Sequence, residues 1–204
     1  YILYDVASLT PFTPLADVGV FLGGENTSDH AGYAVVSIGD SDTDGYPEVA
    51  VGAPEASTDS ASIAGKVYII YSDAVRKEDS SLGDYPYMEG AEKYTRLGMR
   101  IFAVGDVDLD DDARADIMMG VPFPTPNGSV ATGWAGIVYA SPMTWTEGNP
   151  NPLRMNFNND QKNPENSEWR VEGAHVGFVI EGGGTQFGRA ATRIPDVDGD
   201  GVDD

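Results

Sequence analysis

Residues 40–48 read Asp40-Ser41-Asp42-Thr43-Asp44-Gly45-Tyr46-Pro47-Glu48. Acidic side chains stand at positions one, three, five and nine of this stretch, and a glycine stands at position six. Ca²⁺ takes six to eight oxygen ligands at about 2.3–2.6 Å, so alternate carboxylates converge on one ion only where the chain turns sharply. Glycine permits such a turn because it adopts positive φ at little cost. The stretch therefore predicts a loop that binds a divalent cation.

Two further copies of this loop occur in the chain. The same spacing returns near the C-terminus as Asp196-Val197-Asp198-Gly199-Asp200-Gly201-Val202-Asp203-Asp204. A longer, distorted copy lies between the other two, and its candidate ligands are Asp106, Asp108, Asp110, Asp112, Arg114 and Asp116. Because three similar loops lie in similar surroundings, the sequence predicts about three Ca²⁺ sites.

The middle loop admits two registers. Counting forward from Gly98 places Asp106 first, as in the other two copies. Counting back from the strand that follows places Asp108 first and gives an intact 1-3-5-9 set that ends at Asp116. The second register puts Ala113 at the turn position, where positive φ is unfavourable, but it supplies the ninth-position acid and is preferred for that reason. We expect weaker binding here than in the outer two loops.

The residues after each loop predict a strand and not the helix of an EF-hand. An EF-hand ends with a bidentate Glu at position twelve, whereas position twelve counted from Asp40 is Val51. Glu48 is followed by the short apolar run Val49-Ala50-Val51-Gly52-Ala53-Pro54, and residues 116–122 repeat this pattern. A short apolar run that ends in Gly and Pro is typical of a buried strand. Each loop is therefore expected to join two strands.

The composition limits the function classes. The chain has 204 residues, 33 acids, 12 Lys+Arg and a formal net charge of -21, which argues against nucleic acid or an anionic membrane as a partner. It has no cysteine, which excludes disulfides and thiolate metal sites. No apolar run is long enough to span a bilayer, so no direct membrane insertion is expected. Millimolar Ca²⁺ is available outside cells, which favours an extracellular location, secreted or cell-surface.

The loops belong to a longer repeat. Each repeat starts with a short strand that ends in glycine. These strands are expected within Val20-Phe21-Leu22-Gly23-Gly24-Glu25, Tyr87-Met88-Glu89-Gly90-Ala91-Glu92 and Arg170-Val171-Glu172-Gly173-Ala174. A turn that contains a second glycine follows, then an alternating strand, the cation loop, a strand that ends in Gly-X-Pro and one further strand. Repeats of several short strands indicate an all-β fold of propeller blades or stacked β modules.

The repeat divides the chain into five parts. Residues 1–17 are expected to hold the last strand of a preceding blade and a linker. Blades follow at 18–75 and 86–142, an Asn- and Pro-rich inserted loop at 143–168, and a truncated third blade at 169–204. The first residue is Tyr and no signal peptide is visible, so we expect a processed or partial piece of a longer polypeptide.

These motifs resemble FG-GAP repeats, the units of the seven-bladed β-propeller of integrin α subunits and related surface proteins. Phe187-Gly188 matches the FG pair, Gly52-Ala53-Pro54 matches GAP, and Gly120-Val121-Pro122 nearly does. The resemblance implies an incomplete propeller with Ca²⁺-binding hairpin loops. It further implies side-chain ligands and, at Tyr46 and Val202, backbone carbonyl ligands; the side-chain ligands are Asp40, Asp42, Asp44, Glu48, Asp196, Asp198, Asp200 and Asp204.

The resemblance also implies a function. It indicates a non-enzymatic extracellular scaffold for cell adhesion or protein–protein assembly, whose partner is another protein or a glycan on an extracellular surface. No catalytic residue is expected, because His30 and His175 are isolated and the chain has no GxSxG, HExxH or P-loop motif. Two alternatives stay open. The chain is either a non-catalytic propeller part of a secreted hydrolase or carbohydrate-binding protein, or a structural subunit completed by neighbouring copies or the rest of a longer chain.

Overall fold

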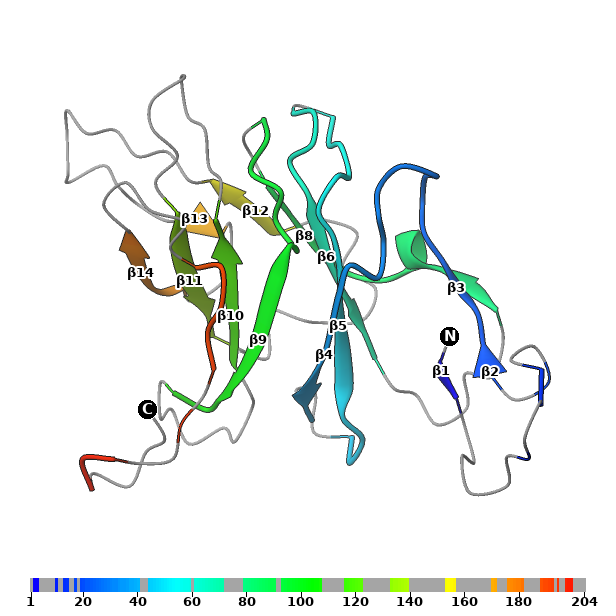
Figure 1. The fold of residues 1–204 in the computed structure, drawn as a ribbon, viewed down its shortest axis with the longest axis horizontal. Helices are drawn as coiled ribbons and strands as arrows, with labels where there is room; N and C mark the ends of the chain where they lie inside the picture. Colours follow the sequence, from blue (N-terminus) through cyan, green and yellow to red (C-terminus); the bar gives the residue numbers. More distant parts are fainter. Residues whose placement is uncertain are drawn as a thin grey trace.

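The structure of the chain is a computed structural model. It describes residues 2–3, 10, 13–14, 17, 19–40, 44–59, 61–71, 79–90, 93–107, 116–122, 133–139, 153–156, 170–171, 176–181, 188–192, 194 and 197–199. Within these ranges the fold is all-β, with a short 3₁₀ turn, η3 (Leu82–Asp84), and no α-helix (Figure 1). The described residues also contain no helix that is both long and apolar enough to cross a bilayer.

The strands are short, and most were expected from the sequence. In chain order they are β1 (Ile2–Leu3), β2 (Gly19–Val20), β3 (Leu22–Gly23), β4 (Ala34–Gly39), β5 (Glu48–Ala53), β6 (Lys66–Ile70), β7 (Ser80–Ser81), β8 (Tyr87–Gly90), β9 (Arg100–Gly105), β10 (Asp116–Val121), β11 (Trp134–Val138), β12 (Leu153–Asn156), β13 (Arg170–Val171) and β14 (Val176–Glu181). The predicted Gly-X-Pro strands are β5 and β10, and the predicted alternating strands are β4 and β9.

Two sheets make up most of the molecule. The first sheet has the order β13-β12-β8-β6-β5-β4, and the second sheet has the order β14-β11-β10-β9. Within these two sheets neighbouring strands are antiparallel, except that β12 pairs in parallel with β8. The edge strands β4 and β9 lie close to each other, so the two sheets stand side by side (Figure 1). The strand pairs β1-β2 and β3-β7 lie on the other side of the first sheet (Figure 1).

The two sheets repeat one ladder. Ala34 of β4 pairs with Gly52 of β5, and Arg100 of β9 pairs with Gly120 of β10. The next strands continue the match, because β6 pairs with β5 in the register in which β11 pairs with β10. A fourth strand pairs with β6 or β11 and follows the other three in the chain; it is β8 in the first sheet and β14 in the second. Four strands in the same order therefore occur twice.

Glycines form the seam between consecutive repeats. A Cβ atom added to Gly52 would overlap the carbonyl oxygen of Gly98, and one added to Gly120 would overlap the carbonyl oxygen of Gly188. Gly98 and Gly188 also have φ values of 86° and 77°. The backbone of each Gly-X-Pro strand thus lies directly on the turn glycine of the next repeat. This close approach is the physical reason for glycine at both positions.

Apolar side chains fill both faces of the first sheet. One cluster lies between the two sheets and includes Ile38, Val67, Ile69, Ile101, Ile117 and Met119. A second cluster lies on the opposite face of the first sheet and includes Val51, Ala53, Tyr68, Ile70, Leu82 and Tyr85. Strands β5 and β6 therefore lie between two apolar layers, which explains their nearly continuous apolar sequences.

Two strands differ from the sequence-based expectation. The strand expected to open the third repeat was placed at 170–173, but β14 at 176–181 pairs with β11 in the place that β8 has beside β6. Both segments contain an apolar residue followed by Glu and Gly, and the apolar run at 176–180 is the longer one. The second difference is β12, which lies inside the expected inserted loop 143–168 and gains its partner from β8, far away in the sequence.

Candidate metal centre

The first loop is held between the end of β4 and the start of β5. Asp40 follows β4 directly, and Glu48 is the first residue of β5. The carboxylate of Glu48 belongs to a fully buried residue, whereas Asp44 is exposed. The loop therefore brings one acid from the protein interior together with acids that reach solvent.

Hydrogen bonds within the loop fold it back on Asp40. The amides of Asp44 and Gly45 donate to the two carboxylate oxygens of Asp40 at 3.1 and 2.9 Å. The amide of Tyr46 donates to Oδ1 of Asp44 at 2.8 Å. Gly45 has a φ of 94°, which confirms the positive φ that the sequence predicted at the sixth position. The turn is thus closed by side chains that the cation motif itself supplies.

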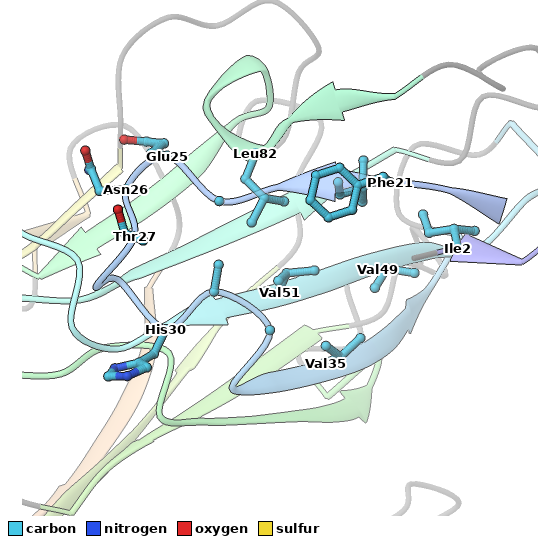
Figure 2. Close-up of a pocket in the computed structure, with 14 residues that line it drawn as sticks. Ile2, Phe21, Glu25, Asn26, Thr27, His30, Val35, Val49, Val51 and Leu82 are labelled. Atoms are coloured by element: carbon cyan, nitrogen blue, oxygen red, sulfur yellow. The ribbon is translucent and has the colours of Figure 1, made fainter. Parts of the chain in front are cut away.

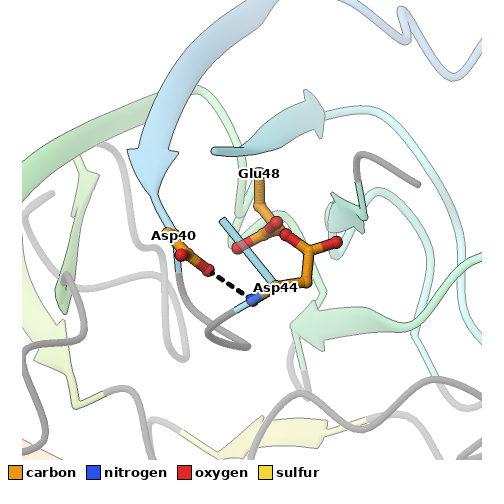
Figure 3. A group of neighbouring side chains, drawn as sticks. All are labelled: Asp40, Asp44 and Glu48. Carbon is orange, nitrogen blue, oxygen red and sulfur yellow. Dashed lines mark hydrogen bonds between the residues drawn. The ribbon is translucent and has the colours of Figure 1, made fainter. Parts of the chain in front are cut away.

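Three carboxylates converge at this loop. One oxygen each from Asp40, Asp44 and Glu48 lies within 4.8 Å of the other two (Figure 3). Such a donor set consists of hard oxygens, which suit Ca²⁺ better than any thiolate- or imidazole-preferring metal. Tyr46, the seventh residue of the loop, has a half-exposed side chain. Asp42 lies outside the described residues. The three carboxylates fit a Ca²⁺ site in their chemistry and their proximity.

The middle loop has the same two ends as the first. Asp106 follows β9 directly, and Asp116 is the buried first residue of β10. The amide of Val107 donates to Oδ2 of Asp116 at 2.8 Å. The candidate ligands Asp108, Asp110, Asp112 and Arg114 lie outside the described residues.

The ladders bear on the register of this loop. Gly39 pairs with Glu48, and Gly105 pairs with Asp116. The first pair is nine positions apart and the second is eleven (48 − 39 and 116 − 105), so two extra residues lie inside the middle loop. Asp106 therefore corresponds to Asp40, and Asp116 corresponds to Glu48. The register counted forward from Gly98 therefore fits the start of the loop, and the register counted back from β10 fits its end.

The third loop is described only in part. Asp198 and Gly199 are exposed, and Gly199 has a φ of 84°. In Figure 1 residues 197–199 lie along the same edge of the molecule as the ends of β4 and β9. The candidate ligands Asp196, Asp200, Val202 and Asp204 lie outside the described residues.

A groove of about 780 Å³ lies on the face of the first sheet that is turned away from the second sheet (Figure 2). Apolar side chains line one part of the groove, and polar residues line the rest. The apolar residues are Ile2, Phe21, Leu22, Val35, Val49, Val51 and Leu82, and the polar ones include Glu25, Asn26, Thr27 and His30. Nδ1 of His30 lies 3.2 Å from Oε2 of Glu55, and the side chain of His30 is exposed. His175 lies outside the described residues.

A partly buried charged cluster beside this groove was not predicted from the sequence. Nζ of Lys66 lies 2.9 and 3.0 Å from the two carboxylate oxygens of Glu25, and the hydroxyl of Tyr68 donates to the same carboxylate at 3.0 Å. Nζ also lies 4.3 Å from the ring centre of Tyr87. Burial raises the pKa of Tyr68 far above its ordinary value, and the charge of Glu25 adds to the effect. The signal for this cluster was Lys66, a lysine that directly precedes the apolar run of β6.

Comparison with known proteins gives one informative match. No protein family that is defined by a sequence profile matches the chain. Over 159 residues the chain is 26% identical to the phosphatidylinositol-glycan-specific phospholipase D of Bos taurus. The match covers 73% of this chain and 16% of that enzyme. The chain therefore corresponds to a small part of the length of this relative.

Proposed function

We propose that the chain is part of a calcium-binding β-propeller scaffold built from FG-GAP repeats. The scaffold is extracellular, is not an enzyme, and holds another protein or a glycan in adhesion or assembly. The observation that carries the proposal is the convergence of the Asp40, Asp44 and Glu48 carboxylates in a loop whose two ends recur in the second sheet. Asp42 and the carbonyl of Tyr46 complete the ligand set by the resemblance.

A cation bound at this loop stabilises the fold by offsetting the repulsion between the carboxylates. Three negative charges close together repel one another, and one of them belongs to a fully buried residue. Ca²⁺ offsets this repulsion and ties the end of β4 to the start of β5. For dissociation constants of about 10⁻⁴–10⁻³ M, about 1 mM Ca²⁺ adds roughly 0.4–1.4 kcal/mol of stability per site. The role of the metal is therefore structural.

The sheets support the propeller part of the proposal. Each four-stranded ladder has the same strand order and receives its fourth strand from later in the chain. The edge strands β4 and β9 lie close to each other, as the innermost strands of successive blades do around an axis. The partner then binds at the ends of these strands opposite the acidic loops. Tyr33 and Tyr94 are exposed before β4 and β9, and exposed tyrosines are frequent anchors in interfaces.

Thermal unfolding with and without Ca²⁺ tests the metal proposal. The melting temperature should be higher in millimolar CaCl₂ than in EDTA, and millimolar MgCl₂ should have less effect. Asp44→Ala should remove part of the increase. Asp59→Ala removes an exposed acid that lies outside the three loops and should leave the increase intact. Equal melting temperatures in CaCl₂ and EDTA would contradict the proposal.

The match to the phospholipase favours one second candidate. In this second candidate the chain is a non-catalytic part of a longer secreted hydrolase, a proposal supported by its alignment with 16% of a phospholipase D. Both candidates predict that the chain alone does not release a glycosylphosphatidylinositol-anchored protein from vesicles. Release by the purified chain would show that it is an enzyme. Release only by a longer polypeptide that includes the chain would favour the second candidate.

A further inference from the structure

The same irregularity interrupts both copies of the ladder beside the loop. In the first sheet Ser37 pairs with Val49 and Gly39 pairs with Glu48, so Ile38 is an extra residue. In the second sheet the pairing likewise passes over one residue of β9, just before Gly105. A β-bulge of this kind bends the strand and changes the direction of the side chains that follow it.

Each bulge contains a glycine in a left-handed conformation. Gly39 has a φ of 76°, and Gly105 has a φ of 77°. Each glycine pairs directly with the buried acid of the next strand, Glu48 or Asp116. Each is also followed at once by the first acid of its loop. The two copies thus share a bulge, a left-handed glycine and an acid on each side of it.

Strand geometry shows why this arrangement matters. Residues that face each other across an antiparallel ladder project to the same face, and successive residues project to opposite faces. Because Gly39 faces Glu48, a regular strand would direct the next residue, Asp40, away from Glu48. The carboxylates of Asp40 and Glu48 nevertheless lie in one cluster. The positive φ at Gly39 changes the course of the chain between the two acids.

We infer that Gly39 and Gly105 are positioning residues for the cation sites, an inference that rests on the proposed Ca²⁺ binding. Their left-handed conformation lets the preceding strand keep its apolar residues in the core while the first loop acid meets the buried acid of the next strand. Residues with a Cβ atom adopt this conformation only at a cost in free energy, and Asn tolerates it better than Ala. The requirement for glycine at these two positions therefore comes from the backbone conformation.

The third loop provides a contrast within the chain. Gly188 and Asp196 are eight positions apart, as are Gly32 and Asp40, so Pro195 stands at the position of Gly39. Proline fixes φ near −65° and cannot adopt the left-handed conformation. The inference therefore predicts that the first loop depends on this φ and that the third loop is entered in a different way.

Terbium binding to the first loop tests the inference. Tyr46 is the only tyrosine in the three loop sequences, so Tb³⁺ emission that tyrosine sensitises reports mainly on this loop. Gly39→Ala should weaken Tb³⁺ binding about tenfold, the equivalent of the conformational cost. Gly39→Asn should stay within about threefold of the wild type, because Asn tolerates positive φ. Gly23→Ala, at a glycine outside the loops where an added Cβ makes only ordinary contacts, is the matched control.

Melting in EDTA separates positioning from a general structural role. For Gly39→Ala, a positioning role predicts a smaller rise in melting temperature on adding Ca²⁺ than in the wild type. A merely structural role predicts a lower melting temperature in EDTA, an unchanged rise with Ca²⁺ and unchanged Tb³⁺ affinity, and this result would overturn the inference. If the wild type itself shows neither Tb³⁺ emission nor a rise with Ca²⁺, the proposed function fails, and the inference fails with it.

Discussion

The same edge-strand position occurs twice in this molecule, once covered and once open. On the second sheet, Ile101 lies in the apolar cluster beneath the first sheet and is 7% exposed. The matching residue of the first sheet is Val35, because Ile101 pairs with Met119 as Val35 pairs with Val51. Val35 lines the groove and is 63% exposed (Figure 2). Two equivalent residues thus have very different surroundings.

The difference shows that a neighbouring sheet determines whether the side chain at this position is buried. Both residues are β-branched, both lie in edge strands, and both face apolar partners across the ladder. The residues before these strands behave in the same way, since Tyr33 is 53% exposed and the corresponding Met99 is 9% exposed. An apolar pattern defines which face of a strand can be buried, and the adjoining repeat determines whether it is buried.

The largest effect is expected from a charge placed on the two faces. Ile101→Asp puts a carboxylate between the two sheets and should lower the free energy of unfolding by about 3–5 kcal/mol. Val35→Asp, at the equivalent open position, should change it by less than about 0.5 kcal/mol. Urea unfolding followed by circular dichroism measures both. Similar losses in the two variants would mean that the first-sheet face is also covered in solution.

A second matched pair examines the glycine seam. Gly98→Ala introduces a Cβ that overlaps the carbonyl oxygen of Lys66, and it also strains a residue with a φ of 86°. It should cost about 3 kcal/mol. Gly32→Ala has the same strain, with a φ of 87°, but its Cβ has no neighbour within 4 Å. This variant should lower the free energy of unfolding by about 1–2 kcal/mol. The difference between the two variants measures the contribution of the close backbone contact at Gly98.

The partly buried ion pair of Lys66 with Glu25 lies on the side of the first sheet that is turned away from the second sheet. Lys66 pairs across the ladder with Ala53, and the corresponding position in the second sheet is Trp134, which cannot form this pair. Glu25→Gln leaves the buried ammonium of Lys66 without its countercharge and should cost about 2 kcal/mol. The double variant Glu25→Gln with Lys66→Met should recover part of the loss. Additive losses in the double-mutant cycle would show that the pair is not coupled.

High pH should weaken the first sheet by a smaller amount. Burial raises the folded-state pKa of Tyr68 above its unfolded value of about 10. The neutral hydroxyl therefore contributes its full stability below pH 10, and the contribution is lost as the pH rises further. The loss should reach about 1 kcal/mol at pH 11. Urea unfolding between pH 8 and pH 11 should show a steeper decline for the wild type than for Tyr68→Phe. Parallel declines in the two proteins would contradict the assignment to this tyrosine.

Local patterns in the sequence were sufficient to predict some structural features and not others. The strands β5 and β10 and the positive φ of Gly45 follow from short motifs, because turn chemistry and apolar runs act over a few residues. The parallel strand β12 and the pairing of β14 with β11 depend on partners far away in the chain. The ion pair of Lys66 with Glu25 joins residues 41 positions apart, and the bulge at Gly39 becomes visible only when two strands are placed side by side. No single segment contains the information for these features.

The fourth strand of each sheet has a consequence for biosynthesis. Because β8 follows β4, β5 and β6 in the chain, the four-stranded ladder of the first sheet is not complete until residue 90 has left the ribosome, and that of the second sheet must wait for residue 181. Until then the outer edge of β6 or β11 is an unpaired template on the nascent polypeptide. Translation speed between residues 139 and 176 therefore sets how long the edge of β11 remains open to wrong partners.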